Sequence, residues 1–211
     1  MIKVGVAQKD VRTDYRDVAV LLPAYNEEAA VGDTVQAFLQ ALPGCTVIVC
    51  NNCSTDQTAS VARAAGAQVI DENMPGKGNA VRRLFATVDA TLYVMADADT
   101  TYDANAAREM IEKMQAEHLD MVTGVRVHSD KTAYRRGHVW GNLVFNKLFS
   151  RLFNSATQDV FSGYRILSGR FARSLPVQST GFEIETEMIE MASTGKTELW
   201  VRPAFAVTLS P

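Results

Sequence analysis

The feature that most constrains the fold is a repeated alternation of short apolar runs with longer amphipathic segments. The apolar runs have the length and composition of buried strands, and the longer segments carry apolar side chains at helical spacing. The predicted strands are 18–22, 46–50, 67–70, 91–96 and 119–125. The predicted helices between them are 28–42, 54–65, 80–88 and a helix that begins near Asp103. This alternation predicts an α/β fold with a mainly parallel central sheet flanked by helices.

The alternation becomes less regular in the last third of the chain. Segment 139–153 is strongly amphipathic, 181–193 is a predicted helix, and 198–207 is the predicted final strand. No linker separates the two parts of the chain, so we expect a single domain over residues 1–211.

Composition and charge exclude several classes of protein. The formal net charge of −3 argues against a protein that holds nucleic acid by bulk electrostatics. No run of 18 or more apolar residues is present, so we expect no membrane-spanning helix, and the N-terminus does not have the pattern of a signal peptide. The chain has three cysteines, an odd number that fits a reducing, cytoplasmic location.

The strongest local signal is the pair Asp97 and Asp99, which follows the predicted strand 91–96. Residues two apart in extended chain point the same way, so both carboxylates converge at the end of this strand. Open α/β sheets bind ligands at the carboxyl ends of their strands. Two like charges so close together favour a hard divalent cation, Mg²⁺ or Mn²⁺, as their partner. The alternative explanation is a solvated acidic turn.

Three further loops carry polar groups that can contact a ligand. Segments 23–28 and 51–56 follow the first two predicted strands, and their amide and carboxylate groups can contact a base or a ribose. In the third loop Gly76 and Gly78 flank Lys77, so the backbone can approach a ligand closely while the lysine supplies charge for a phosphate. Asn, Ser and Asp also favour turns for local reasons, which gives each loop an ordinary structural explanation.

The segment that begins at Cys50 also suggests two other features. Cys50 and Cys53 form a C-x-x-C pair between a strand and a helix, the setting of a thioredoxin-like redox motif. Five or more α/β units do not match that small fold, and a zinc site is disfavoured because no histidine is near the cysteines in sequence. Ser54 and Gln57 form a predicted capping box at the start of helix 54–65.

Taken together and in order, these motifs resemble family 2 glycosyltransferases of the glycosyltransferase A fold. The closest similarity is to the polyprenyl-phosphate (dolichol-phosphate) sugar transferase branch. The resemblance covers about residues 18–207 and rests on six motifs: PAYNEE at 23–28, NNCSTDQT at 51–58, GKGNAVR at 76–82, DAD at 97–99, SGYRILS at 162–168 and GFEIETE at 181–187. It implies a nucleotide-sugar-binding part at about 18–125 and an acceptor-side part at about 126–211.

The resemblance implies a nucleoside-diphosphate sugar as donor, UDP- or GDP-linked, and transfer with inversion. Asp97 and Asp99 would hold Mg²⁺ or Mn²⁺ on the diphosphate, where a metal acts as a Lewis acid on the leaving group. The implied donor-binding residues are Pro23, Ala24, Tyr25, Asn26, Glu27, Asn51, Asp56, Gly76, Lys77, Asp97, Ala98 and Asp99.

The acceptor remains open between a polyprenyl phosphate and a sugar hydroxyl of a cell-envelope glycan precursor. A lipid phosphate is already ionised and needs positive charge and hydrogen-bond donors. The candidates for that role are Arg135, Arg136, Ser162 and Arg165. A hydroxyl acceptor needs a carboxylate to take its proton. The candidates for that base are Asp159, Glu183 and Glu185. Of both sets, we expect Asp159, Glu183 and Arg165 to be catalytic.

These acceptor-side residues also have ordinary structural explanations. The arginines can belong to a solvated basic loop, and the glutamates can be the acidic first turn of a helix. Segment 139–153 could lie in a membrane interface and deliver a lipid acceptor, or it could pack on the core. We therefore expect a cytoplasmic protein with peripheral contact at the cytoplasmic face of the membrane as the lipid-dependent alternative.

Three departures from the family pattern support alternative functions. Asn51 and Asn52 stand where the family usually has an Asp pair, and Cys53 replaces a usual glycine, which matters if the turn needs a positive φ. The usual basic segment R-x-x-G-x-S-K after the last strand is absent. One alternative is a truncated or non-catalytic nucleotide-sugar-binding domain. Another is a sugar nucleotidyltransferase, although PAYNEE stands where that class has a glycine-rich loop.

Overall fold

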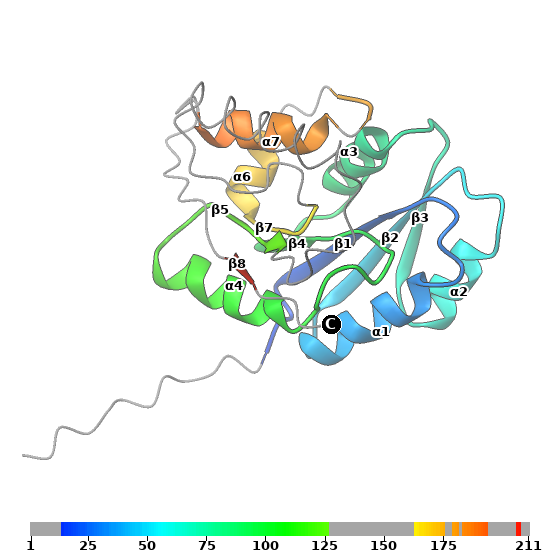
Figure 1. Cartoon of the computed structure of the whole chain (residues 1–211), viewed down its shortest axis with the longest axis horizontal. Coiled ribbons are helices and arrows are strands. Elements are labelled where there is room, and N and C mark those ends of the chain that lie inside the picture. The colour runs from blue at the N-terminus through cyan, green and yellow to red at the C-terminus, as the bar shows by residue number, and fades with distance from the viewer. Residues whose placement is uncertain (1–13, 127–162, 176–178, 182, 194–205, 208–211) are drawn as a thin grey trace, which may run out of the picture.

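The computed structural model describes residues 14–126, 163–175, 179–181, 183–193 and 206–207 (Figure 1). The strands are β1 Val18–Ala24, β2 Thr46–Asn52, β3 Gln68–Glu72, β4 Leu92–Met95, β5 Met121–Thr123, β6 Val125–Arg126, β7 Arg165–Ser168 and β8 Ala206–Val207. The helices are α1 Val31–Ala41, α2 Thr58–Ala64, α3 Lys77–Thr87, α4 Ala106–Ala116, α6 Gly169–Ser174 and α7 Ile184–Ser193.

The central sheet has six strands in the order β3-β2-β1-β4-β7-β5. Strands β3, β2, β1 and β4 are mutually parallel, and β7 runs antiparallel to both β4 and β5. A separate two-stranded sheet pairs β6 with β8 in parallel. The predicted α/β fold with a mainly parallel sheet is therefore confirmed. Because β1, β2, β3 and β4 are parallel, their carboxyl ends meet at one edge.

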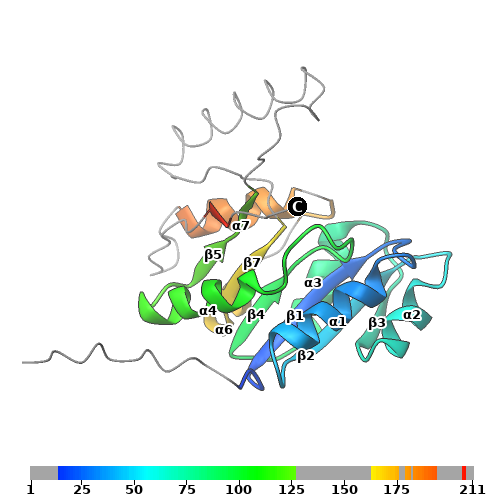
Figure 2. The ribbon, with the colours of Figure 1, turned by 60° about the horizontal axis from the view of Figure 1, so that its bottom comes forward.

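Helices cover both faces of the central sheet. Helices α1, α2 and α4 lie on one face, and α3, α6 and α7 lie on the other (Figures 1 and 2). Strand β1 contributes to both layers: Val20 and Leu22 pack with α1, whereas Leu21 packs with α3 and α6. This alternation follows from the two-residue period of a strand, and burial on both faces explains why β1 is apolar throughout.

Two local predictions are wrong for identifiable reasons. The predicted strand 119–125 is divided at Gly124, whose amide donates to the carbonyl of Tyr164, so β5 stays in the main sheet while β6 pairs with β8. The predicted capping box is absent, because the Ser54 hydroxyl accepts instead from the amide of Asn26. Helix α2 begins later, at Thr58, whose amide donates to the Asp56 carboxylate at 3.0 Å.

Three larger predictions concern the second part of the chain. The predicted helix 181–193 is confirmed as α7, which starts at Ile184. Segment 139–153 and most of the predicted strand 198–207 lie outside the described residues. Among the helices that the structure describes, none combines the length and the apolar character that crossing a bilayer requires.

Candidate functional site

The loops that follow β1 and β2 hold each other at the carboxyl edge of the sheet. The backbone amide of Asn26 donates to the Ser54 hydroxyl at 3.0 Å, and the Asn26 side chain accepts from the amide of Thr55 at 2.8 Å. The amide of Glu28 donates to the Asp56 carboxylate at 3.1 Å. The polar groups of these residues therefore bond between the two loops, while Asp56 also bonds within its own loop to Thr58. The result is a preorganised pair of loops at the edge where ligands bind in such folds.

Both loops contain a residue with a left-handed backbone. Asn26 has φ 55° and Cys53 has φ 60°. Asparagine adopts this region with little penalty, whereas a cysteine pays the ordinary steric cost of an L-residue there. The turn at Cys53 therefore does require the positive φ that glycine would accommodate freely.

Asn51 and Asn52 are used differently. Asn52 is buried, donates through its amide nitrogen to the carbonyls of Glu72 and Met74 at 3.2 and 2.7 Å, and accepts from the amide of Gly76 at 2.8 Å. Only an amide both donates and accepts in this way. Asn51 donates to the Asp71 carboxylate at 2.8 Å, and its side-chain oxygen is buried without a partner among the described residues. Asn52 thus anchors the loop that leads to Lys77, a role that the sequence did not reveal.

The two glycines beside Lys77 approach the chain's own backbone. A Cβ atom on Gly76, whose φ is 128°, would lie 2.3 Å from the carbonyl oxygen of Thr180. A Cβ atom on Gly78 would lie 2.1 Å from the carbonyl oxygen of Ser179, and the Gly78 amide donates to Thr180 at 3.0 Å. The expected close backbone approach is therefore real, but in this structure it seats residues 179–180 against the start of α3.

Lys77 is the centre of the site. Its ammonium lies 2.6 Å from the carboxylate of Asp97 and 2.6 Å from that of Glu185. The side chains of Lys77 and Glu185 are only 11% and 5% exposed, while that of Asp97 is 31% exposed. Burial lowers the pKa of Lys77, but the attraction of Asp97 and Glu185 outweighs it and the net shift is upward. The ammonium therefore stays charged.

Asp97 has further neighbours in the structure. The Tyr102 hydroxyl lies 3.4 Å from its second oxygen and accepts from the amide of Gly163 at 3.0 Å. A Cβ atom on Gly163 would lie 2.7 Å from the same carboxylate oxygen. A side chain at position 163 would therefore displace the Asp97 carboxylate.

Asp99 and Glu27 extend the negative charge of the site. Asp99 is exposed and accepts from the amide of Thr101 at 3.0 Å. The pKa of Glu27 is raised, first by burial and then by the negative charges of Asp99, Asp97 and Asp56. Several carboxylates so close together at one edge attract cations, and Lys77 already supplies one at Asp97.

The residues at this edge fit a divalent cation that is shared with a ligand. Within the described ranges, no group of three or more His, Cys, Asp or Glu residues is arranged to enclose an ion. Asp97 and Asp99 supply carboxylate oxygens, the donor type that Mg²⁺ and Mn²⁺ prefer. Mg²⁺ commonly uses one or two protein carboxylates together with phosphate oxygens and water.

The other predicted donor-side residues differ in how much of their side chains reaches the surface of this edge. Ala24 and Ala98 are buried, and the carbonyl of Ala98 accepts from the Thr34 hydroxyl at 3.2 Å, so these two residues contribute backbone rather than side chains. Tyr25 is 60% exposed beside them, and Pro23 is half-buried in β1.

The structure describes only some of the acceptor-side candidates. Arg165 is fully buried in β7, opposite Met95 of β4 and Thr123 of β5. Glu183 is exposed just before α7, whereas Glu185 reaches Lys77. The remaining candidates, Arg135, Arg136, Asp159 and Ser162, lie outside the described residues.

The three cysteines do not form a disulfide with one another in this structure. Cys45, Cys50 and Cys53 are all free thiols. Cys50 is buried, and burial raises its pKa to about 12. Redox exchange requires a thiolate, which is scarce at neutral pH for such a group.

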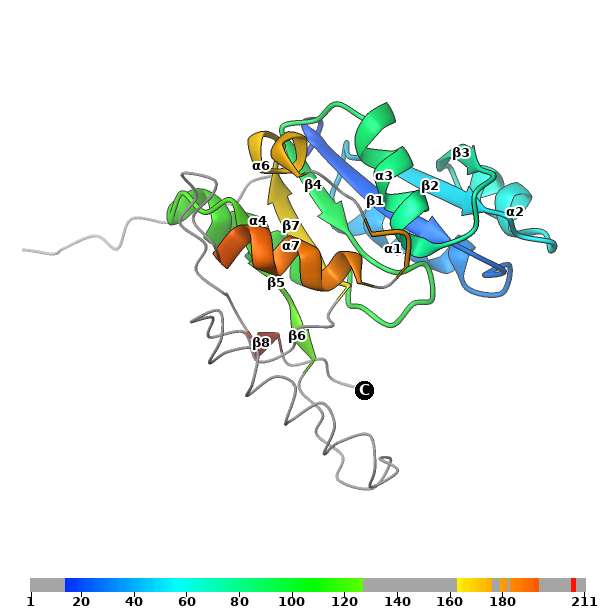
Figure 3. The ribbon, with the colours of Figure 1, turned by 90° about the horizontal axis from the view of Figure 1, so that it is seen from above.

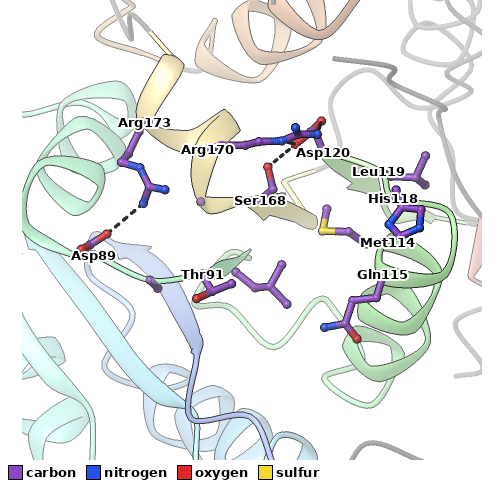
Figure 4. Close-up of a pocket in the computed structure, with 13 residues that line it drawn as sticks. Asp89, Thr91, Met114, Gln115, His118, Leu119, Asp120, Ser168, Arg170 and Arg173 are labelled. Carbon is purple, nitrogen blue, oxygen red and sulfur yellow. Dashed lines mark hydrogen bonds and ion pairs between the residues drawn. The ribbon is translucent and has the colours of Figure 1, made fainter. Parts of the chain in front are cut away.

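A separate cavity of about 810 Å³ lies at the opposite edge of the sheet, beside the starts of β4 and β5 (Figure 4). Its charged side chains pair within the wall: Arg170 and Ser168 bond to Asp120, and Arg173 lies 3.0 Å from Asp89. Asp120 is buried, so these bonds fix α6 to the start of β5. The volume of this cavity therefore does not mark the chemical site, whose carboxylates lie at the other edge.

Comparison with known proteins identifies similar chains. The family model described as glycosyl transferase family 2 matches residues 19–174. Protein RfbJ of Shigella flexneri is 46% identical over 123 residues, which are 58% of this chain and 95% of that protein. A dolichyl-phosphate hexose transferase of Haloferax volcanii is 28% identical over 172 residues, which are 81% of this chain and 75% of that protein.

A solved structure has the same fold. It is glucosyl-3-phosphoglycerate synthase of Mycobacterium tuberculosis in complex with Mn²⁺, UDP-glucose and phosphoglyceric acid. The TM-score is 0.69 at 25% identity, and the match covers 82% of this chain and 64% of that one. The chain also spans only 59% and 46% of two further curated relatives from Haloferax volcanii.

Proposed function

This chain belongs to glycosyl transferase family 2, and we propose that it transfers a hexosyl group from a nucleoside-diphosphate sugar to a polyprenyl phosphate. The observation that carries the proposal is the acidic pair at the carboxyl edge of the sheet: Asp97 and Asp99 both follow β4, and Asp97 lies 2.6 Å from the ammonium of Lys77. Opposite charges at one position suit a ligand that combines a divalent cation with a diphosphate.

The donor would lie across the loops after β1, β2 and β4. Asp97 and Asp99 would hold Mg²⁺ or Mn²⁺, and the ion would stabilise the negative charge that develops on the departing nucleoside diphosphate. The ammonium of Lys77 would add positive charge close to the same phosphates. Tyr25 and Asn51 would face the nucleoside, and the hydrogen bonds between their two loops would keep these side chains in position.

The proposed acceptor follows from its chemistry and from the relatives. A phosphate monoester is ionised at neutral pH and attacks without a strong general base. The Haloferax relative is named for a dolichyl-phosphate acceptor, and the mycobacterial structure contains an acceptor that bears a carboxylate and a phosphate. Because a polyprenyl phosphate resides in a bilayer, we propose peripheral association with the cytoplasmic face of the membrane. Inversion at the sugar carbon is part of the same proposal.

Calorimetric titration with UDP- and GDP-sugars, with and without Mn²⁺, tests donor binding. We expect binding of one of the two donors that strengthens with Mn²⁺ and is lost in Asp97→Ala and Asp99→Ala. Asp89→Ala is the matched control, because Asp89 is exposed in the wall of the distant cavity. Binding that ignores both Mn²⁺ and Asp97 would refute the proposal.

Transfer is tested separately with labelled donor sugar and a short polyprenyl phosphate in detergent micelles. We expect label in the lipid fraction. If the donor binds but neither transfer nor donor hydrolysis is detected, the result would favour the non-catalytic nucleotide-sugar-binding alternative.

A further inference from the structure

The Lys77–Glu185 pair joins two parts of the chain that are 108 residues apart in sequence. Lys77 is the first residue of α3, and Glu185 lies in the first turn of α7. Seen from above, the start of α7 lies beside α3 (Figure 3). Ile184 and Met188 of α7 pack with Val81 of α3. Core packing therefore fixes where the Glu185 carboxylate can reach.

Because both side chains are buried, the ion pair between Lys77 and Glu185 is needed to keep either charge stable. The side chain of Glu185 is 5% exposed and that of Lys77 is 11% exposed. A buried carboxylate is strongly destabilising without a compensating cation. The Gly78 amide also bonds to Thr180, which fixes the segment before α7 against the start of α3. Lys77 is thus held from the side of α7 as well as from the side of Asp97.

The Lys77 ammonium also forms an ion pair with Asp97, one of the two carboxylates proposed to bind the divalent cation. It lies 2.6 Å from Asp97, so a divalent cation bound through Asp97 would stand next to a fixed positive charge. Two cations at such a distance repel each other strongly in a partly buried site. The free protein therefore satisfies Asp97 with its own lysine.

We propose that Lys77, held in place by Glu185, guards Asp97 in the donor-free protein, so that a divalent cation binds tightly only together with a diphosphate. This inference rests on the proposed function and adds Glu185 to it as a positioning residue. A diphosphate brings negative charge that attracts both the metal and the ammonium, which removes their mutual repulsion. Each ligand then strengthens the binding of the other by the same factor.

The test compares Mn²⁺ binding to the wild-type protein and to the double variant Lys77→Met/Glu185→Gln. The double variant removes one positive and one negative charge, so the net charge of the site is unchanged. It also avoids the buried, uncompensated Glu185 that Lys77→Met alone would leave. Free Mn²⁺ is measured by electron paramagnetic resonance, first with Mn²⁺ alone and then with UDP or GDP added. Thermal unfolding of each variant confirms that it is folded.

We expect the double variant to bind Mn²⁺ alone about 10-fold more tightly than the wild type, and to gain less from UDP than the wild type does. The matched control is Lys113→Met/Glu117→Gln, which removes a 2.6 Å lysine–glutamate pair from α4. We expect the control to bind Mn²⁺ as the wild type does.

The failures are distinguishable. If the wild type binds Mn²⁺ with UDP but the folded double variant binds Mn²⁺ alone no more tightly than the wild type, the guarding role of Lys77 is wrong and the proposed function stands. If the wild type binds no Mn²⁺ with either UDP or GDP, the proposed metal-dependent function is wrong, and this inference is overturned with it.

Discussion

Asn52 offers a sharp test of the structure because it stands where the family usually has an aspartate. By family pattern Asn52→Asp restores the usual residue and should do no harm. The structure predicts damage, because the side-chain nitrogen of Asn52 donates to the carbonyls of Glu72 and Met74 at 3.2 and 2.7 Å in a buried position. A carboxylate has no hydrogen to donate and would place negative charge against two carbonyl oxygens.

The size of the effect follows from those two bonds. A buried polar group left unsatisfied costs about 1–3 kcal/mol, so we expect the free energy of unfolding to fall by about 2–4 kcal/mol at neutral pH. Urea denaturation measures this as a lower midpoint. Asn105→Asp is the exposed control: the Asn105 side chain donates to the solvent-exposed Asp103 at 3.1 Å, so the same substitution there should change stability by less than about 1 kcal/mol.

The pH dependence of the variant gives a second measurement. Burial raises the pKa of the introduced carboxyl group above its unfolded value, and its protonated form can donate one of the two lost bonds. The folded variant then binds a proton that the unfolded chain does not, so the destabilisation shrinks as the pH falls from about 8 to about 5. A variant as stable as the wild type, or one whose deficit grows at low pH, would refute this account of Asn52.

Three further predictions test other parts of the structure. Cys53→Gly should stabilise the protein by about 1 kcal/mol in thermal unfolding, because residue 53 has φ 60°; an unchanged or lower midpoint would contradict the strain at this turn. Gly163→Ala should weaken Mn²⁺ binding in the presence of UDP by about 10-fold or more, because the added Cβ would displace Asp97; titration calorimetry that finds wild-type affinity would show that the contact is not used. Asp120→Asn should lower the free energy of unfolding by about 2–3 kcal/mol while leaving UDP binding unchanged, since Asp120 only fixes α6 at the far edge; a loss of UDP binding in the folded variant would contradict that separation.

The sequence predicted the parallel part of the sheet because its strands are buried on both faces. Residues such as Val20 and Leu21 pack on opposite layers, so the whole run must be apolar and is visible in the sequence. The antiparallel strand β7 was not predicted in that orientation. Its first residue is Arg165, which is fully buried although its side chain is charged, and only the pairing with β4 and β5 reveals its direction.

The sequence located the carboxylate pair but not the contacts around it. Asp97 and Asp99 follow an obvious strand, so their position at the sheet edge could be predicted. Glu183 and Glu185 were both candidates because both lie at the start of a predicted helix, and Glu183 was the one expected to be catalytic. The structure distinguishes them, because Glu183 precedes α7 and is exposed, whereas Glu185 lies within α7 and is directed by the packing of Ile184 onto α3. Such a choice depends on tertiary packing, which local patterns do not contain.

The charges at this edge also bear on the proposed metal dependence. Burial and then the negative charges of Asp99 and Asp97 raise the pKa of Glu27. The positive charge of Lys77 is already shared between Asp97 and Glu185. A diphosphate would be repelled by such an edge unless a cation came with it. An edge of this composition therefore favours the complex of a divalent cation with a diphosphate over either component alone, and this is the selectivity that the Mn²⁺ and UDP titrations measure.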